Sequence, residues 1–335
     1  MAPQTASPSP SLVPDRRVPR TDPVRPFPSG TVLMTPAPMT PAAHVTAEIA
    51  SQPETWQRAL ELLPRVRDVL PRPGQRVAVV GCGTSWFVAQ SYAVHREAAG
   101  QGWTDAFAAS EFPDARAGQY DLVVAISRSG TTTEVLDLLR RLPDGQRTLA
   151  VIGDPRSPGA SAADDTVLLD FADEQSVVQT RFATSALLLL RAGLGEDLGP
   201  VVEQGRAAVT ADLPPGWQDR WQFVFLGTGT SVGIAHEAAL KMREAALAWS
   251  ESYPAWDYRH GPIAVAQERT LAWIFGEPPA GLEDQIRATG ATVVRSDDDP
   301  LASLVLAQRL AVAVALHRDL DPDTPPHLTR SIVLS

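Results

Sequence analysis

The sequence is short of cysteine: its 335 residues contain a single one, Cys82. One cysteine cannot form a disulfide within the chain, and it cannot supply a cluster of thiolates to a metal. The sequence therefore excludes a disulfide-stabilised scaffold and a cysteine-rich metal site. A lone thiol fits best in a reducing cytoplasm.

Positive charge and long apolar runs are also scarce. The chain has 29 Lys and Arg against 39 Asp and Glu, which gives a formal net charge of -10 at pH 7. Capture of nucleic acid requires a positive surface, so we expect a small-molecule partner and no nucleic acid. The run "FATSALLLL" at 182–190 is far shorter than the roughly 20 residues that cross a bilayer, so no membrane span is predicted.

Two common nucleotide-binding motifs are missing. The sequence contains no G-x-x-x-x-G-K-[ST], and neither "GCGTSW" (81–86) nor "GTGTSV" (227–232) completes G-x-G-x-x-G. A P-loop and a nicotinamide site are therefore not expected.

The N-terminal segment differs in composition from the rest of the chain. Residues 1–43 are rich in Pro, Ser and Thr and have no apolar signal segment, which predicts disorder. Met34 and Met39 are alternative starts to Met1. With 44% hydrophobic and 20% charged residues, the whole chain has the balance of a globular protein and is long enough for two domains.

Beyond the N-terminal segment, short apolar runs alternate with helical patterns, as in parallel sheets. "VAVVGCGTS" (77–85) and "FVFLGTGTS" (223–231) form an internal repeat. The pattern predicts an α/β fold of two tandem doubly wound, flavodoxin-like domains at 44–200 and 201–335. We expect strands at 76–81, 120–127, 148–154, 221–229, 270–276 and 292–296, and helices at 56–70, 82–100, 131–142, 176–192, 231–249, 280–289 and 301–317.

The stretch "AISRSGTTTEV" (125–135) places five hydroxyl side chains between an expected strand and the helix after it. Helix N-termini favour anions, Gly130 permits close approach, and Arg128 can add a pair of hydrogen bonds. A helix cap is the alternative, but it needs only one hydroxyl. Thr84 and Ser85 in "GCGTS" supply a second such turn, which favours an anion site.

The second half contributes charged residues. Glu237, Lys241 and Glu244 fall at i, i+4 and i+7 on one helix stripe, with Glu251 two turns further on. A solvated face of ordinary ion pairs is the alternative. His260 follows in the loop 253–265, and its alternative role is that of a turn residue. A carboxylate and an imidazole are the groups that an aldose–ketose proton shift requires.

These motifs together resemble the sugar isomerase (SIS) family, and most closely the isomerase half of glutamine:fructose-6-phosphate amidotransferase and related amino-sugar phosphate isomerases and deaminases. The resemblance runs from about residue 45 to 335. It includes "AEIASQPETW" (47–56), "ASEFPDAR" (109–116), "HEAALKMREAA" (236–246), "RHGPIA" (259–264) and the tail "DLDPDTPPHLTRSIVLS" (319–335).

The resemblance implies roles for individual residues. Glu244 would move the C1/C2 proton, with the pair Glu237 and Lys241 beside it. His260 would open the sugar ring and be lent by a second subunit, which implies a homodimer. The sugar phosphate would be bound by Thr84, Ser85, Ser127, Arg128, Ser129 and Thr132.

Two residues depart from the family pattern. Arg128 stands where the amidotransferases usually have Gln. Arg330 stands where the family's tail has a lysine that forms a Schiff base, and a guanidinium, which stays protonated, cannot do so. No glutaminase domain precedes residue 45 in this sequence, so we do not expect glutamine to serve as the ammonia source.

The sequence thus predicts a cytoplasmic phosphosugar isomerase or isomerising deaminase acting on a hexose or amino-sugar 6-phosphate, without cofactor or metal. Lys241 or Arg330 would stabilise developing oxygen charge. The alternatives are a phosphosugar-binding regulator without chemistry and a deglycase of fructosamine phosphates. The sequence does not identify the sugar.

Overall fold

The computed structural model describes residues 40–334. The prediction of disorder for residues 1–43 falls mostly outside the described residues, which begin at position 40, and so do the alternative starts Met34 and Met39. Within the described part, a helix already begins at Ala43.

The helices are α1 Ala43–Ala50, α2 Gln52–Val66, α3 Thr84–Ala98, α4 Thr133–Arg141, α5 Arg181–Gly193, α6 Gly199–Thr210, α7 Val232–Ala246, α8 Leu282–Ala288 and α9 Pro300–His317. The strands are β1 Val77–Gly81, β2 Thr104–Ala108, β3 Leu122–Ser127, β4 Thr148–Ile152, β5 Asp165–Leu168, β6 Gln222–Gly227, β7 Trp249–Pro254, β8 Thr270–Phe275 and β9 Thr292–Ser296.

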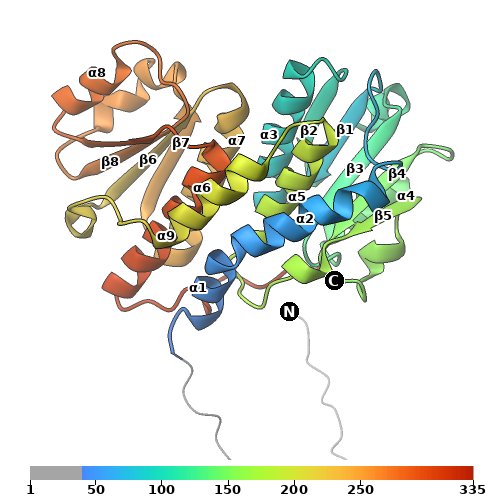
Figure 1. Ribbon diagram of the computed structural model, residues 1–335, viewed down its shortest axis with the longest axis horizontal. Helices are drawn as coiled ribbons and strands as arrows, with labels where there is room; N and C mark the ends of the chain where they lie inside the picture. The colour runs from blue at the N-terminus through green and yellow to red at the C-terminus, as the bar shows by residue number, and fades with distance from the viewer. Residues whose placement is uncertain (1–39, 335) are drawn as a thin grey trace, which may run out of the picture. The chain divides into compact units, whose positions relative to one another are not determined.

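The strands form two parallel sheets (Figure 1). The first has the order β2-β1-β3-β4-β5, which is the flavodoxin-like order. The second has the order β7-β6-β8-β9, so it repeats the first four positions of that pattern. The prediction of an α/β fold with two parallel sheets is confirmed.

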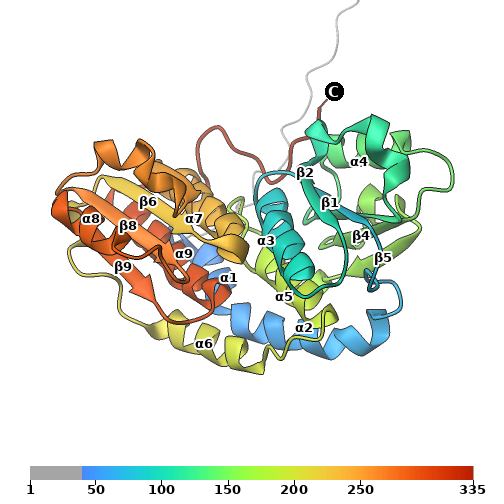
Figure 2. The ribbon, with the colours of Figure 1, turned by 90° about the horizontal axis from the view of Figure 1, so that it is seen from above.

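The apolar side chains form one large core between the sheets and two smaller ones outside. The large core joins one face of each sheet to α1, α2, α3, α5, α7 and α9 (Figure 2). The smaller clusters lie under α4 on the first sheet and under α8 on the second. Because both sheets share the large core, the division into two tandem domains stays a prediction, and its boundary at 200/201 falls inside α6.

Three strands were not predicted: β2, β5 and β7. All three are edge strands with half-exposed residues, so none shows the continuous apolar run of a buried strand. The helix predicted at 231–249 ends at Ala246 because Leu247 adopts a left-handed conformation, with φ of 49°. Glu251, expected on that helix, lies on β7 instead. Helix α6 was not predicted, and the helix expected from 176 begins at Arg181.

Helices α3 and α7 join the two halves at very short range. A Cβ atom on Gly233 would lie 2.3 Å from the carbonyl oxygen of Phe87 and 2.8 Å from the amide of Ser91. The Ser91 hydroxyl donates to the carbonyl of Thr230 at 2.7 Å. The two backbones therefore touch where the start of α7 meets Phe87 and Ser91 of α3.

Helix α9 is the one described helix that is long and apolar enough to cross a membrane. It is 67% buried and packs against α6 and α7 in the large core. This burial is the pattern of a core helix, so the hydropathy of α9 is explained by the fold.

Candidate functional site

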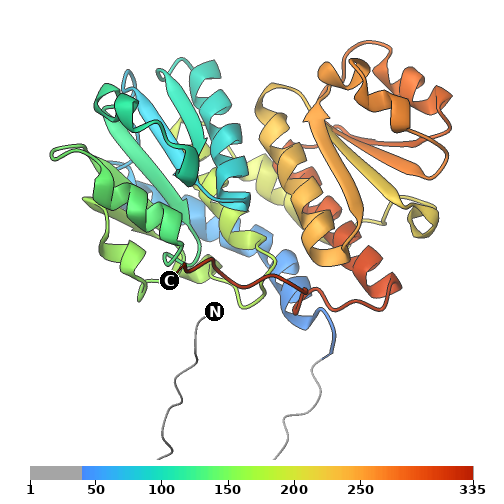
Figure 3. The same ribbon diagram turned by 180° about the vertical axis from the view of Figure 1, so that it is seen from behind.

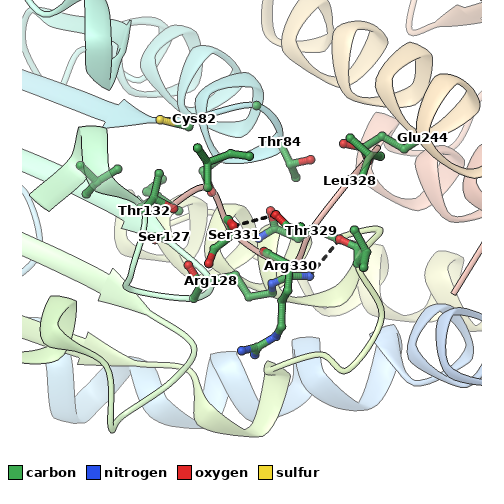
Figure 4. A pocket seen from close by; sticks show the side chains of 18 residues that line it. Cys82, Thr84, Ser127, Arg128, Thr132, Glu244, Leu328, Thr329, Arg330 and Ser331 are labelled. Carbon is green, nitrogen blue, oxygen red and sulfur yellow. Dashed lines mark hydrogen bonds between the residues drawn. The ribbon is translucent and has the colours of Figure 1, made fainter. Parts of the chain in front are cut away.

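A cavity of about 180 Å³ opens at the carboxyl ends of β1 and β3 (Figure 4). The strand order of the first sheet reverses between these two strands, and ligands of open α/β sheets bind at such points. Its wall comes from the two turns after these strands, the loop before α5, the last part of α7 and the C-terminal tail. The lining residues are Cys82, Gly83, Thr84, Ser85, Ile126, Ser127, Arg128, Ser129, Thr132, Val135, Val177, Gln179, Glu244, Leu328, Thr329, Arg330, Ser331 and Ile332.

The turn after β3 presents its serine hydroxyls to the cavity. The amide of Gly130 donates to Ser127 Oγ at 3.1 Å, and the amide of Thr131 donates to Ser129 Oγ at 3.2 Å. Since each serine oxygen accepts from the turn, each keeps its own proton for a further acceptor. The predicted anion site at this turn, called here the phosphate cradle, is therefore shaped to donate hydrogen bonds.

Gly130 is required by packing rather than by a ligand. Its φ is 60°, and a Cβ atom there would lie 2.0 Å from Ser157 Oγ. The amide of Gly159 also donates to its carbonyl at 2.8 Å. The close approach expected at this glycine is thus made by the protein itself.

The turn after β1 connects the cradle to the second half. Thr84 and Ser85 are buried and line the cavity. Thr84 Oγ1 accepts a hydrogen bond from Lys241 Nζ at 3.0 Å, so the first turn of α3 contacts α7 directly. The Thr84 hydroxyl also hydrogen-bonds Glu237, which lowers the pKa of that carboxyl against the larger effect of burial.

The charged stripe on α7 is buried, not solvated. Lys241 Nζ lies 2.5 Å from Glu244 Oε2 and 3.5 Å from Glu237 Oε1. Burial raises the pKa of Glu237 to about 8 against the opposing effect of Lys241. Burial alone would lower the pKa of Lys241, but the two carboxylates outweigh it and raise that pKa. Of the three side chains only Glu244 lines the cavity. Lys241 and Glu237 therefore lie behind the wall, where Lys241 holds Glu244 and Glu237 lies beside Lys241.

Arg128 lines the cavity, but its guanidinium is directed at carbonyl oxygens. Nη1 donates to Ser176 O at 3.0 Å and to Val177 O at 3.3 Å, and Nη2 donates to Arg330 O at 2.5 Å. The carboxylate of Glu174 lies 3.9 Å away. In this conformation Arg128 therefore does not offer the expected pair of hydrogen bonds to a phosphate.

The C-terminal tail crosses from α9 to the first half and forms one side of the cavity (Figures 3 and 4). Arg330 Nη2 lies 2.5 Å from Asp173 Oδ1, and its Nε donates to Glu174 O at 3.1 Å. Sequence reasoning found Arg330 but missed Thr329 and Ser331, which also line the cavity. Both residues flank Arg330 in the tail motif, so their position beside it could have identified them.

His260 lies outside this cavity. It is an exposed residue after the 3₁₀ turn Asp257–Arg259, and it is not among the residues that line the cavity of its own chain. The structure of one chain thus brings Glu244 to the cradle and leaves His260 apart.

Comparisons with known proteins agree with this geometry. Residues 72–192 match the SIS domain family model, a segment that contains β1 to β5 and both hydroxyl-rich turns of the first half. The resemblance to the SIS family is confirmed for this segment.

Curated relatives extend the similarity into the second half. Glutamine–fructose-6-phosphate aminotransferase (isomerizing) of Methanothermobacter thermautotrophicus is 26% identical over 325 residues, covering 83% of this chain and 54% of that protein. The same enzyme of Thermus thermophilus is 25% identical, covering 79% and 53% respectively. The chain spans about half the length of these relatives.

Solved structures resemble nearly the whole described chain. Glucosamine-6-phosphate deaminase of Thermotoga maritima superposes with a TM-score of 0.71 at 26% identity, covering 86% of this chain and 99% of that one. Tagatose-6-phosphate ketose/aldose isomerase of Escherichia coli superposes with a TM-score of 0.69 at 20% identity, covering 88% and 99%. The second likeness shows the fold alone.

Proposed function

We propose that this chain, whose residues 72–192 form an SIS domain, is a cytoplasmic phosphosugar isomerase or isomerising deaminase that acts on a hexose or amino-sugar 6-phosphate. One observation carries the proposal. A single cavity places the hydroxyl-rich turns of the first half beside Glu244 from the second half. Phosphate binding and proton transfer thus have their groups in one place.

The phosphate is held by uncharged donors at the N-terminus of α4. Ser127 and Ser129 have free hydroxyl protons, and Thr132 is the residue that precedes the helix. The positive end of the helix dipole compensates part of the phosphate charge. Ser85 adds a donor from the turn after β1, and Thr84 lines the cavity beside it.

Glu244 carries the proton between the two carbons. Its carboxylate takes the proton from C2 of the open-chain aldose, and the bonding pair forms the C1=C2 bond of an enediol as the O1 carbonyl gains a proton. The same carboxyl group returns its proton to C1, while O2 loses one and becomes the ketose carbonyl. The hydrogen bond from Lys241 fixes the carboxylate for both steps.

His260 is proposed to act from a second copy of the chain. It is exposed, and among residues 40–334 the wall of the cavity contains no imidazole, so within one copy Glu244 has no second acid–base group beside it to open the sugar ring. A homodimer in which each His260 enters the partner's cavity supplies that group.

Mixing two inactive variants tests the dimer. Glu244→Gln and His260→Gln should each be inactive, but co-refolded mixtures should recover about a quarter of the wild-type activity, since half of the dimers are mixed and each has one intact site. Recovery no greater than the sum of the separate variants would contradict a shared site.

Proton exchange tests the reaction itself. The protein is incubated in D₂O with glucose, fructose, glucosamine and galactosamine 6-phosphates, with and without ammonia, and followed by NMR. Deuterium should enter C1 or C2 of at least one sugar, with interconversion or release of ammonia. Tight binding of a sugar phosphate with no exchange at either carbon would reject the enzyme and support a binding protein.

A non-catalytic phosphosugar-binding regulator is the second candidate. The observation in its favour is Arg330, whose guanidinium is held by Asp173 and the Glu174 carbonyl and offers no amine to a sugar carbonyl. Release of a free amino acid from a fructosamine phosphate in the same NMR assay would instead identify a deglycase.

A further inference from the structure

We propose that Arg128 is a positioning residue that fastens the C-terminal tail over the cavity, and that it is not a ligand of the phosphate. The inference rests on the proposed function only in taking this cavity as the phosphosugar site. It assigns a role to the first of the two residues that depart from the family pattern.

The hydrogen bonds of Arg128 connect two distant segments. Nη1 binds the carbonyls of Ser176 and Val177 in the loop before α5, and Nη2 binds the carbonyl of Arg330 in the tail, 202 residues away. A guanidinium suits this task because its donors point in fixed directions within one plane. The side chain therefore joins the tail to the loop.

A buried counter-charge keeps Arg128 in place. Only 5% of the Arg128 side chain is exposed, and the fully buried carboxylate of Glu174 lies 3.9 Å from Nη1. Burying an arginine without such a partner would cost several kcal/mol. The Glu174 carboxylate is itself held at Oε1, which accepts from the amide and hydroxyl of Thr180 and from the amide of Arg181.

The loop that receives Arg128 is anchored independently of the tail. Glu48 of α1 accepts from the amides of Gln175 and Ser176 and from the Ser176 hydroxyl. Since loop 173–180 is held from α1 and by Glu174, it is the fixed support, and the tail is the part that Arg128 positions.

The tail is attached on its other side to the phosphate cradle. Thr133 at the start of α4 donates its amide to Ile332 O at 3.2 Å, and the hydroxyls of Thr131 and Ser331 lie 2.9 Å apart. Thr329 and Ser331 lie between these attachments and line the cavity. The tail thus spans the cavity between the Arg128 side and the α4 side.

The two departures from the family pattern therefore form one unit. Arg128 binds the main-chain carbonyl of Arg330, while the side chain of Arg330 binds Asp173 and the Glu174 carbonyl. Both contacts draw the same tail residue to the same loop. Arg330 is placed to hold the tail rather than to react with the sugar.

Two measurements on one variant separate positioning from phosphate binding. Arg128→Met is compared with wild type by hydrogen exchange of the tail, read by mass spectrometry, and by calorimetry with inorganic phosphate. Loss of a hydrogen bond from a charged donor, worth about 1.5–3 kcal/mol, should speed tail exchange about tenfold or more. The Kd for inorganic phosphate should change less than about threefold, because the other donors of the cradle remain.

Control variants make the result decisive. Ser129→Ala should give the opposite pattern, with weaker phosphate binding and unchanged tail exchange. If Arg128→Met does not fold because Glu174 is left unpaired, the double variant Arg128→Met with Glu174→Gln removes both charges and should show the same rapid tail exchange. Arg128→Lys should restore protection of the tail in part.

The opposite outcome overturns the proposal. A rise of about tenfold or more in the Kd for phosphate, with tail exchange as in wild type, would make Arg128 a ligand of the phosphate. Neither measurement needs turnover, so a failure here is distinct from a failure to find an enzymatic reaction.

Discussion

The turns after β1 and β6 have nearly the same sequence, "GCGTS" and "GTGTS", but different roles. In the first, Thr84 and Ser85 line a cavity. In the second, Ser231 accepts from the amide of Thr228 at 2.8 Å and lies 2.7 Å from the carbonyl of Phe275, to which it donates. The second turn is closed by its own hydrogen bonds.

The difference between the turns lies in their neighbours. Beside the first is the turn after β3, which supplies Ser127, Ser129 and the N-terminus of α4. Beside the second is the end of β8, followed by "GEPPAG" (276–281) with no hydroxyl side chain. The repeated motif therefore indicates a repeated fold, but not a repeated binding site. A binding site also requires a neighbouring turn whose hydroxyl groups are free to donate to a ligand.

The largest effect is expected at Glu244, which α7 of the second half contributes to the cavity of the first half. Glu244→Gln removes the group that we propose accepts the proton, so turnover of every active sugar phosphate should fall by about 10²- to 10⁴-fold in a steady-state assay. Glu251→Gln is the matched control because Glu251 lies on β7 and outside the cavity wall. Equal losses in both variants would mean that the two halves do not share one site.

An intermediate effect should distinguish the two turns directly. Ser129→Ala should weaken binding of inorganic phosphate about tenfold in calorimetry, because a hydrogen bond to a charged group is lost. Ser231→Ala should leave that Kd unchanged and lower the free energy of unfolding by about 1–3 kcal/mol in urea denaturation, because the buried groups around it lose a partner. A phosphate defect in Ser231→Ala would show that the second turn also binds ligand.

The last effect concerns the pH dependence of stability rather than binding or turnover. The folded-state pKa of Glu237 is about 8, above its ordinary value of 4.5, so the folded state holds a proton that the unfolded state has released. The contribution of this buried carboxyl to folding stability is fully present below about pH 4.5, where both states are protonated. It is lost as the pH rises to about 8, because the folded state must then bury a charged carboxylate. Wild type should therefore lose stability relative to Glu237→Gln between pH 5.5 and 8 in thermal melts. Glu203→Gln, at an exposed position of α6, serves as the control, and a constant difference between wild type and Glu237→Gln would refute the raised pKa of the Glu237 carboxyl.

The first half of the site could be predicted from sequence because its signals are local. A buried strand, a glycine and a group of hydroxyls fall within one stretch, and the strand order brings two such stretches together. Spacing along α7 likewise placed Glu237, Lys241 and Glu244 on one face. It could not show that this face is buried, because the covering residues come from α3.

Contacts between distant segments were missed. The sequence suggested that Arg128 binds the phosphate. It could not show that the Arg128 guanidinium turns toward Glu174 and Arg330, because these residues lie 46 and 202 positions further along the chain. The end of α7 was misplaced because a leucine, Leu247, takes the conformation that usually marks a glycine. That error placed Glu251 on the wrong element.

The contact at Gly233 has a consequence for how such a site adapts to new substrates. Since α3 and α7 touch through their backbones at Gly233, and Lys241 of α7 donates to Thr84 of α3, the two helices have little room to move apart or together. The cavity can then be enlarged or narrowed mainly along the tail, residues 328–332. Among chains with this arrangement, we expect differences in substrate preference to come from changes in the C-terminal tail rather than from changes in α3 and α7.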